Sequence, residues 1–165
     1  MIPIFQQIVD KGRGDCFKCC VASIFELNYD QVPNFIEDKS GTMDDVSAKW
    51  LNQFGYKTVS ISLNDKFDIY GIDWILAKGL FCVLSVPSQK FEGGSHAVVG
   101  KFTGKENSYE LKIVHDPNAQ NVPYPDDVKI SRVRFFVPVI PKVLISKICF
   151  KLPEGQILNE ACYAK

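Results

Sequence analysis

The spacing of apolar and polar residues changes character halfway along the chain. In the first half, residues 16–27 (CFKCCVASIFEL) are apolar on almost every side, which predicts a buried helix that begins after Asp15 as its N-cap. Residues 42–55 place their apolar side chains on one face, with Thr42 as a cap and Gly55 as the stop. They predict a second helix.

Alternating or continuously apolar runs separated by Gly, Asn, Asp and Pro then predict strands. These strands are residues 56–63, 80–87, 96–104, 108–117, 132–140 and 142–152, with a short helix at 71–79. Helices that come first and strands that follow are typical of an α+β domain. We therefore expect one domain, 1–152, in which the first helix packs on an antiparallel sheet built from residues 80–150. Residues 153–165 are expected to form a C-terminal tail.

Charge and composition narrow the class of protein. The 165 residues carry 19 Lys and Arg against 19 Asp and Glu, and no basic stretch follows a phosphate backbone, so nucleic acid is not an expected partner. The apolar region 133–150 is interrupted by Arg, Lys and Pro, which argues against a membrane span. The N-terminus lacks the pattern of a signal peptide, so we expect a cytoplasmic protein with free thiols.

Three of the six cysteines fall within residues 14–20, GDCFKCC. Cys16 and Cys19 have the spacing of half a zinc site or of a redox pair. No second pair with matching spacing follows, and no strong strand of a βαβ unit precedes them. A single reactive cysteine is therefore favoured, with no metal and no cofactor. The other cysteines outside the tail residue Cys162 are expected to be buried and unpaired: Cys19, Cys20, Cys82 and Cys149.

Cys16 is the first residue of the predicted helix, where the dipole and the free N–H groups favour a thiolate. The charge of Asp15 opposes this effect, so a nucleophilic Cys16 needs a base and a group that orients the base. The chain contains two histidines, and His96 opens a predicted strand after the sequence EGGS. Asp116 follows the end of the next strand. A hairpin between these strands would bring His96 and Asp116 together, and His115 is then expected to be structural or peripheral.

These residues lie in stretches that resemble the papain-like cysteine peptidase superfamily. The stretches are FQQ…GDCFKCCVASIFELNYDQVPNF, GSHAVVG and VHDPNA, within residues 1 to about 120. The sequence looks closest to the bacteriocin-leader-processing peptidase branch and to small bacterial and phage proteins with the same opening. The resemblance implies a papain-like fold in which Cys16 is the nucleophile, His96 the general base and acid, and Asp116 the group that orients His96.

The resemblance further implies that Gln6 donates to an oxyanion hole beside the backbone N–H of Cys16, with Gln7 as the alternative donor. The expected reaction is hydrolysis of an amide bond in a peptide, protein or small amide, through a thioester. Two alternatives stay open at this point. One is acyl transfer of the transglutaminase kind with the same triad, and the other is a binding module that keeps the fold without turnover.

Overall fold

The computed structural model describes residues 1–63, 79–105 and 108–139. Its elements are α1 (Cys16–Phe25), the 3-10 helix η1 (Tyr29–Gln31), α2 (Met43–Asn52), β1 (Tyr56–Ser62), β2 (Phe81–Pro87), β3 (Ser95–Lys105), β4 (Ser108–His115) and β5 (Arg132–Pro138). The helices precede the strands, and the protein is an α+β domain as predicted. The predicted helix at 71–79 (apart from Gly79), the strand at 142–152 and the tail at 153–165 lie outside the described residues.

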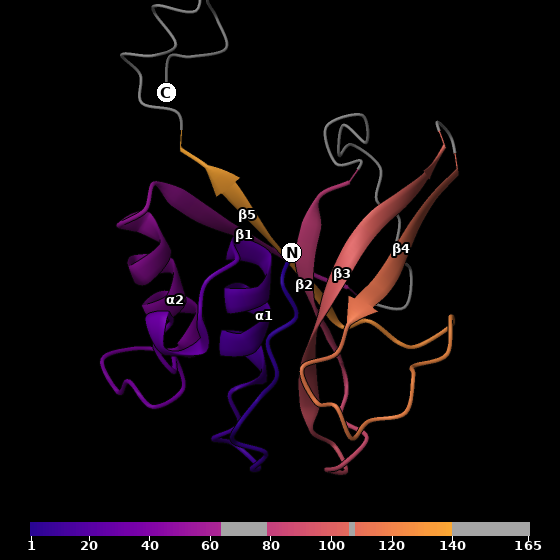
Figure 1. The fold of residues 1–165 in the computed structure, drawn as a ribbon, viewed down its shortest axis with the longest axis horizontal. Coiled ribbons are helices and arrows are strands. Elements are labelled where there is room, and N and C mark those ends of the chain that lie inside the picture. The colour runs from indigo at the N-terminus through magenta and orange to yellow at the C-terminus, as the bar shows by residue number, and fades with distance from the viewer. Residues whose placement is uncertain (64–78, 106–107, 140–165) are drawn as a thin grey trace, which may run out of the picture.

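The five strands form one antiparallel sheet with the order β1-β5-β2-β3-β4 (Figure 1). β1 pairs with β5 along its whole length, from Tyr56 opposite Pro138 to Ser62 opposite Arg132. The prediction that the sheet begins at residue 80 is therefore wrong. It fails because the partner of β1 lies far along the sequence, where strand periodicity carries no information on pairing.

The alternation of side chains along β2 and β3 separates two apolar clusters. Val83, Ala97 and Val99 pack with residues of α1 and α2, so the helices cover this face of the sheet. Leu84 and Val98 belong to the second cluster, on the opposite face. Partly buried residues of the loop between β4 and β5 pack against that second cluster: Tyr124, Val128 and Ile130. The central strands are thus covered on both faces.

A β-bulge near the C-terminal end of β4 shifts the register of its pairing with β3. Val99 pairs with His115 and Gly100 pairs with Ile113, so Val114 is the extra residue. Because side chains alternate along a strand, one extra residue changes which face the following side chains meet. Ile113 packs with the second cluster, whereas His115 sits opposite Val99 of the helix-covered face.

His115 then serves as a contact for the N-terminal segment. Its Nε2 atom lies 2.9 Å from the carbonyl oxygen of Ile4, and its ring meets the ring of Phe5 edge to face. The backbone N–H of Gln6 donates to the carbonyl of Pro117 at 3.0 Å. These contacts place residues 4–6 beside the end of β4, and they confirm a structural role for His115.

Asp15 ties the same segment to the start of α1. The residue is fully buried, and its carboxylate accepts the backbone N–H groups of Gln7 at 3.0 Å and Ile8 at 3.2 Å, together with the hydroxyl of Tyr29. Asp15 occupies the N-cap position, as predicted, but its carboxylate makes no capping bond to the described helix α1. The expected capping role is wrong because the carboxylate points back toward the N-terminal segment.

Replacing Asp15 by Ala would leave two backbone donors and one hydroxyl without their acceptor in a buried site. We expect Asp15→Ala to lower the free energy of unfolding by about 2 to 4 kcal/mol, because buried donors without a partner keep their desolvation cost. Tyr29→Phe is the matched control, since it removes one of the three bonds, and should cost about 1 kcal/mol. Urea unfolding of both variants measures the difference. Equal losses would contradict the role given to this carboxylate.

Candidate active site

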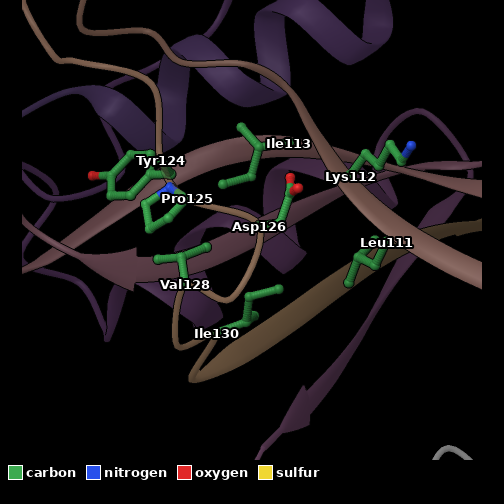
Figure 2. A pocket seen from close by; sticks show the side chains of 8 residues that line it. All are labelled: Leu111, Lys112, Ile113, Tyr124, Pro125, Asp126, Val128 and Ile130. Atoms are coloured by element: carbon green, nitrogen blue, oxygen red, sulfur yellow. The ribbon is translucent and has the colours of Figure 1, made fainter.

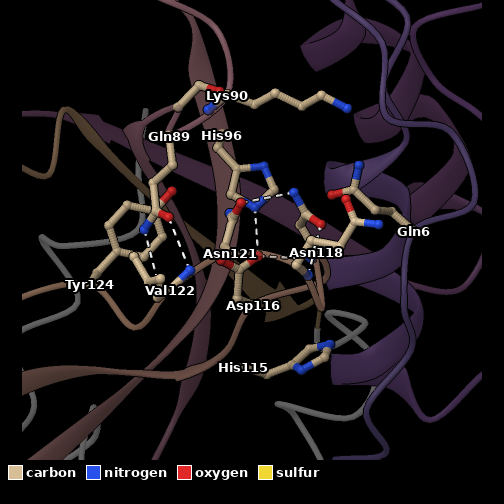
Figure 3. A network of polar contacts seen from close by, with 12 residues as sticks. Gln6, Gln89, Lys90, His96, His115, Asp116, Asn118, Asn121, Val122 and Tyr124 are labelled. Atoms are coloured by element: carbon tan, nitrogen blue, oxygen red, sulfur yellow. Dashed lines mark hydrogen bonds and ion pairs between the residues drawn. The ribbon is translucent and has the colours of Figure 1, made fainter.

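The structure brings His96 and Asp116 together, as the predicted hairpin requires, and Cys16 lines the same hollows as His96. His96 lies near the start of β3, and its Nε2 atom is 2.6 Å from Oδ1 of Asp116, which follows the last residue of β4 (Figure 3). The Cys16 thiol and the imidazole line the same two hollows, and the thiol is one of the groups that shift the pKa of His96. Because Asp116 occupies Nε2, the Nδ1 atom is the ring nitrogen left for the thiol. The expected juxtaposition is present, while the catalytic roles of the three residues stay predictions.

The carboxylate of Asp116 is held on both oxygens. Oδ1 accepts the backbone N–H of Asn118 at 2.8 Å, and Oδ2 accepts the side-chain amide of Asn121 at 2.9 Å. The two asparagine side chains also hydrogen-bond to each other at 2.8 Å (Figure 3). Neither asparagine was among the residues predicted for the site. The signal was the stretch DPNAQN after a strand, because asparagine and aspartate favour such turns.

Side chains on neighbouring turns fix the loop that carries these asparagines. Gln89, in the turn before His96, donates its amide to the carbonyl of Val122 at 2.7 Å and accepts the N–H of Val122 at 3.1 Å. The Tyr124 hydroxyl donates to the carbonyl of Pro87 at 3.0 Å. The β2–β3 turn and the loop after β4 are therefore locked to each other beside His96.

The electrostatics of the site favour a protonated His96 paired with an ionised Asp116. Burial alone lowers the pKa of His96, but the hydrogen bonds to Asp116 and Cys16 and the charges of both residues outweigh it and raise this pKa to about 9. Burial raises the pKa of Asp116, and its bonds from His96, Asn118 and Asn121 outweigh that effect, so the net shift is downward. At neutral pH an imidazolium thus lies between a carboxylate and the Cys16 sulfur.

Gln6 lies beside this pair, whereas the side chain of Gln7 is exposed. The Nε2 atom of Gln6 donates to the carbonyl of Ile8 at 3.1 Å, which uses one of its two hydrogens. Its buried Oε1 atom has no hydrogen-bond partner among the described residues. Of the two candidate oxyanion donors, the structure places Gln6 at the site, with one amide hydrogen still available.

Two hollows flank the Cys16–His96 pair. One, of about 140 Å³, contains Gln6 together with loop residues that include Gly14 and Asn118. The other, of about 420 Å³, is lined instead by β2, β5 and the start of α2. Cys16 and His96 line both hollows, so the thiol borders two separate spaces.

A third hollow of about 460 Å³ lies away from this site, between β4 and the loop before β5 (Figure 2). It is lined by Leu111, Lys112, Ile113, Tyr124, Pro125, Asp126, Val128 and Ile130. In the described part of the chain it shares no lining residue with the two hollows at Cys16. It therefore belongs to the sheet face that the helices do not cover.

The other cysteines behave as core residues where they are described. Cys19, Cys20 and Cys82 are buried and carry free thiols, as predicted, and Cys149 and Cys162 lie outside the described residues. Burial raises the pKa of Cys82 to about 12 and raises those of Cys19 and Cys20 as well. Among residues 1–63, 79–105 and 108–139, no group of three or more His, Cys, Asp or Glu side chains converges on a possible metal position.

Comparison with known proteins adds no assignment. No family model matches this sequence, and no curated protein matches it. Within the residues that the structure describes, no helix has both the length and the apolar character needed to cross a membrane. Membership of the papain-like superfamily, the absence of nucleic acid as a partner and a cytoplasmic location therefore stay predictions.

The raised pKa of His96 predicts how stability depends on pH. The folded-state pKa of about 9 lies above the ordinary value of 6.5, so the stabilisation from His96 is complete below about pH 6.5 and is lost as the pH rises through about 9. We expect the difference in Tm between wild type and His96→Gln to shrink over that range. NMR titration of the His96 ring should give a midpoint near pH 9, and Asp116→Asn should lower it. A wild-type midpoint near 6.5 would contradict the charged pair.

Proposed function

We propose that this protein is a papain-like cysteine hydrolase that cleaves an amide bond through a thioester intermediate. One observation carries the proposal. The imidazole of His96 shares two hollows with the thiol of Cys16 and hydrogen-bonds to a carboxylate that its own neighbours hold in place. A nucleophile, a base and a group that orients the base are the parts that covalent catalysis by a thiol needs.

In the acylation step, the Cys16 thiolate attacks the carbonyl carbon and forms a C–S bond. The imidazolium of His96 gives its proton to the nitrogen of the leaving amine as the C–N bond breaks. Asp116 stays ionised throughout and keeps the ring in place. The products of this step are the free amine and an acyl-thioester on Cys16.

In the deacylation step, water attacks the thioester carbonyl while the now neutral His96 accepts a proton from it. The C–S bond then breaks, the carboxylic acid departs, and the Cys16 thiolate and the His96 imidazolium are restored. Water is the nucleophile in this proposal. An amine in its place would give the amide product of acyl transfer.

Both steps pass through a tetrahedral oxyanion, and two donors beside Cys16 suit it. The first is the backbone N–H of Cys16 at the start of α1. The Asp15 carboxylate makes no capping hydrogen bond to this helix. The second is the amide hydrogen of Gln6 that the carbonyl of Ile8 does not use. Fixed donors of this kind stabilise the transition state more than the ground state.

Alkylation of Cys16 tests the nucleophile without knowledge of the substrate. We expect iodoacetamide at about pH 6 to label Cys16 in preference to the buried thiols, and His96→Ala to slow that labelling by about tenfold or more, because the imidazolium that favours the thiolate is lost. Intact-mass spectrometry against time gives the rates, and peptide mapping identifies the cysteine. Cys16→Ala is the control for labelling elsewhere. Equal rates in wild type and His96→Ala would mean that Cys16 is an unactivated thiol and would leave the binding module as the better reading.

The two glutamines provide a matched test of the oxyanion hole. With p-nitrophenyl acetate as a general acyl donor, we expect Gln6→Ala to lower kcat by about a hundredfold with little effect on KM, since the lost donor acts in the transition state. Gln7→Ala, which removes the neighbouring exposed amide, should stay within about twofold of wild type. The reverse order of effects would transfer the role to Gln7, and two unchanged variants would remove glutamine from the mechanism.

A further inference from the structure

The larger hollow beside Cys16 differs in charge from the smaller one. Its wall includes Arg132 and Arg134 of β5, in addition to His96. Among the described residues that line it, none is an aspartate or a glutamate. Apolar side chains, among them Phe17 and Met43, complete the wall. The cavity therefore combines an apolar surface with unbalanced positive charge immediately next to the nucleophile.

Arg134 is the fixed member of the arginine pair. Its side chain is 4% exposed, and both Nε and Nη2 lie 3.0 Å from Oδ1 of Asp44. Its Nη1 atom donates to the hydroxyl of Ser85 at 3.0 Å, and the guanidinium lies over the ring of Phe17. A guanidinium has five N–H donors, of which these contacts use three. Two hydrogens remain on a group that cannot turn away.

Arg132 is the accessible member. Its side chain is 38% exposed and donates from Nη1 to Oδ2 of Asp44 at 3.0 Å. One carboxylate thus holds both guanidinium groups, and the cluster of Arg132, Arg134 and Asp44 keeps one net positive charge. Asp44 is outside the cavity wall. Asp44 therefore bridges the two arginines without lining the cavity, and Arg132, which does line it, keeps donors that this bridge does not use.

We propose that this cavity binds a carboxylate group of the substrate close to the scissile bond. The inference rests on the proposed hydrolase function and names the substrate class: a peptide with either an acidic side chain or a free C-terminal carboxylate next to the cleaved amide. Planar guanidinium groups match the geometry of a carboxylate, and the apolar wall matches the methylenes that carry it. Arg132 is the substrate-binding residue, and Arg134 is a positioning residue.

Three alkylating probes separate the possible sources of the carboxylate. They are N-iodoacetyl-glutamine amide, which is neutral, N-iodoacetyl-glutamate α-amide, with an acidic side chain, and N-iodoacetyl-glutamine, with a terminal carboxylate. In each case the Cys16 thiolate forms a C–S bond to the methylene carbon and iodide leaves. The rate of Cys16 labelling at low probe concentration therefore reports binding beside the thiol and needs no turnover.

We expect one carboxylate probe to label wild-type Cys16 about tenfold faster than the neutral probe, which is the effect of one charge-assisted hydrogen bond. Arg132→Gln should reduce this ratio to near one, and Arg132→Lys, which keeps the charge, should retain part of it. Lys57→Gln removes a cation from the exposed surface of β1 and serves as the matched control with an unchanged ratio. The faster of the two acids identifies the source of the carboxylate.

A second measurement needs no variant and so does not depend on the folding of Arg132→Gln. Glutarate should slow labelling of wild-type Cys16 by the carboxylate probe, and glutaramide at the same ionic strength should not. Equal rates for all three probes in wild type, or a carboxylate preference that survives Arg132→Gln, would overturn the proposed pocket. A failure of the hydrolase proposal is detected separately. In that case the neutral probe would label Cys16 at the same rate in wild type and in His96→Ala.

Discussion

The buried carboxylate of Asp15 is the contact on which the site depends. It has no exposure to solvent. Its oxygens accept hydrogen bonds from two backbone N–H groups of the N-terminal segment and from the hydroxyl of Tyr29. A buried charge is tolerated only when such donors surround it, so the position of residues 7 and 8 is tightly specified. Gln6 precedes them directly and is thereby held beside Cys16. The ammonium group of Lys18, 3.6 Å from the centre of the Tyr29 ring, adds positive charge nearby.

The same carboxylate also affects Cys16, the nucleophile of the proposed function. Asp15 is adjacent to Cys16 in the chain, and its negative charge opposes the thiolate that the start of a helix would favour. The second carboxylate, Asp116, resolves this through His96. Held by Asn118 and Asn121, it raises the pKa of His96 and so favours an imidazolium in the hollows that Cys16 also lines. The two carboxylates thus have separate effects, one on the arrangement of the backbone and one on the charge of His96.

The two sides of the thiol present different chemistry to a ligand. On the Gln6 side, loops and amide groups line a small hollow, whereas on the β5 side two guanidinium groups face a larger one. Hydrogen bonds support both sides, namely those between the paired loops beside His96 and those from the two arginines to Asp44. Under the proposed function, this difference would give a bound peptide one preferred direction across Cys16.

Local patterns were enough to predict the helix that carries Cys16, the hairpin that joins His96 to Asp116, and the burial of Cys19, Cys20 and Cys82. Each follows from periodicity or from neighbours a few residues apart, which the order of residues encodes directly. The role of Asp15, the choice of Gln6 over Gln7, the pairing of β1 with β5 and the union of Asp44 with Arg132 and Arg134 were not predictable in this way. These depend on contacts between segments up to 111 residues apart. Which donor meets which acceptor is then decided by packing and desolvation in three dimensions, and a one-dimensional pattern contains no measure of either.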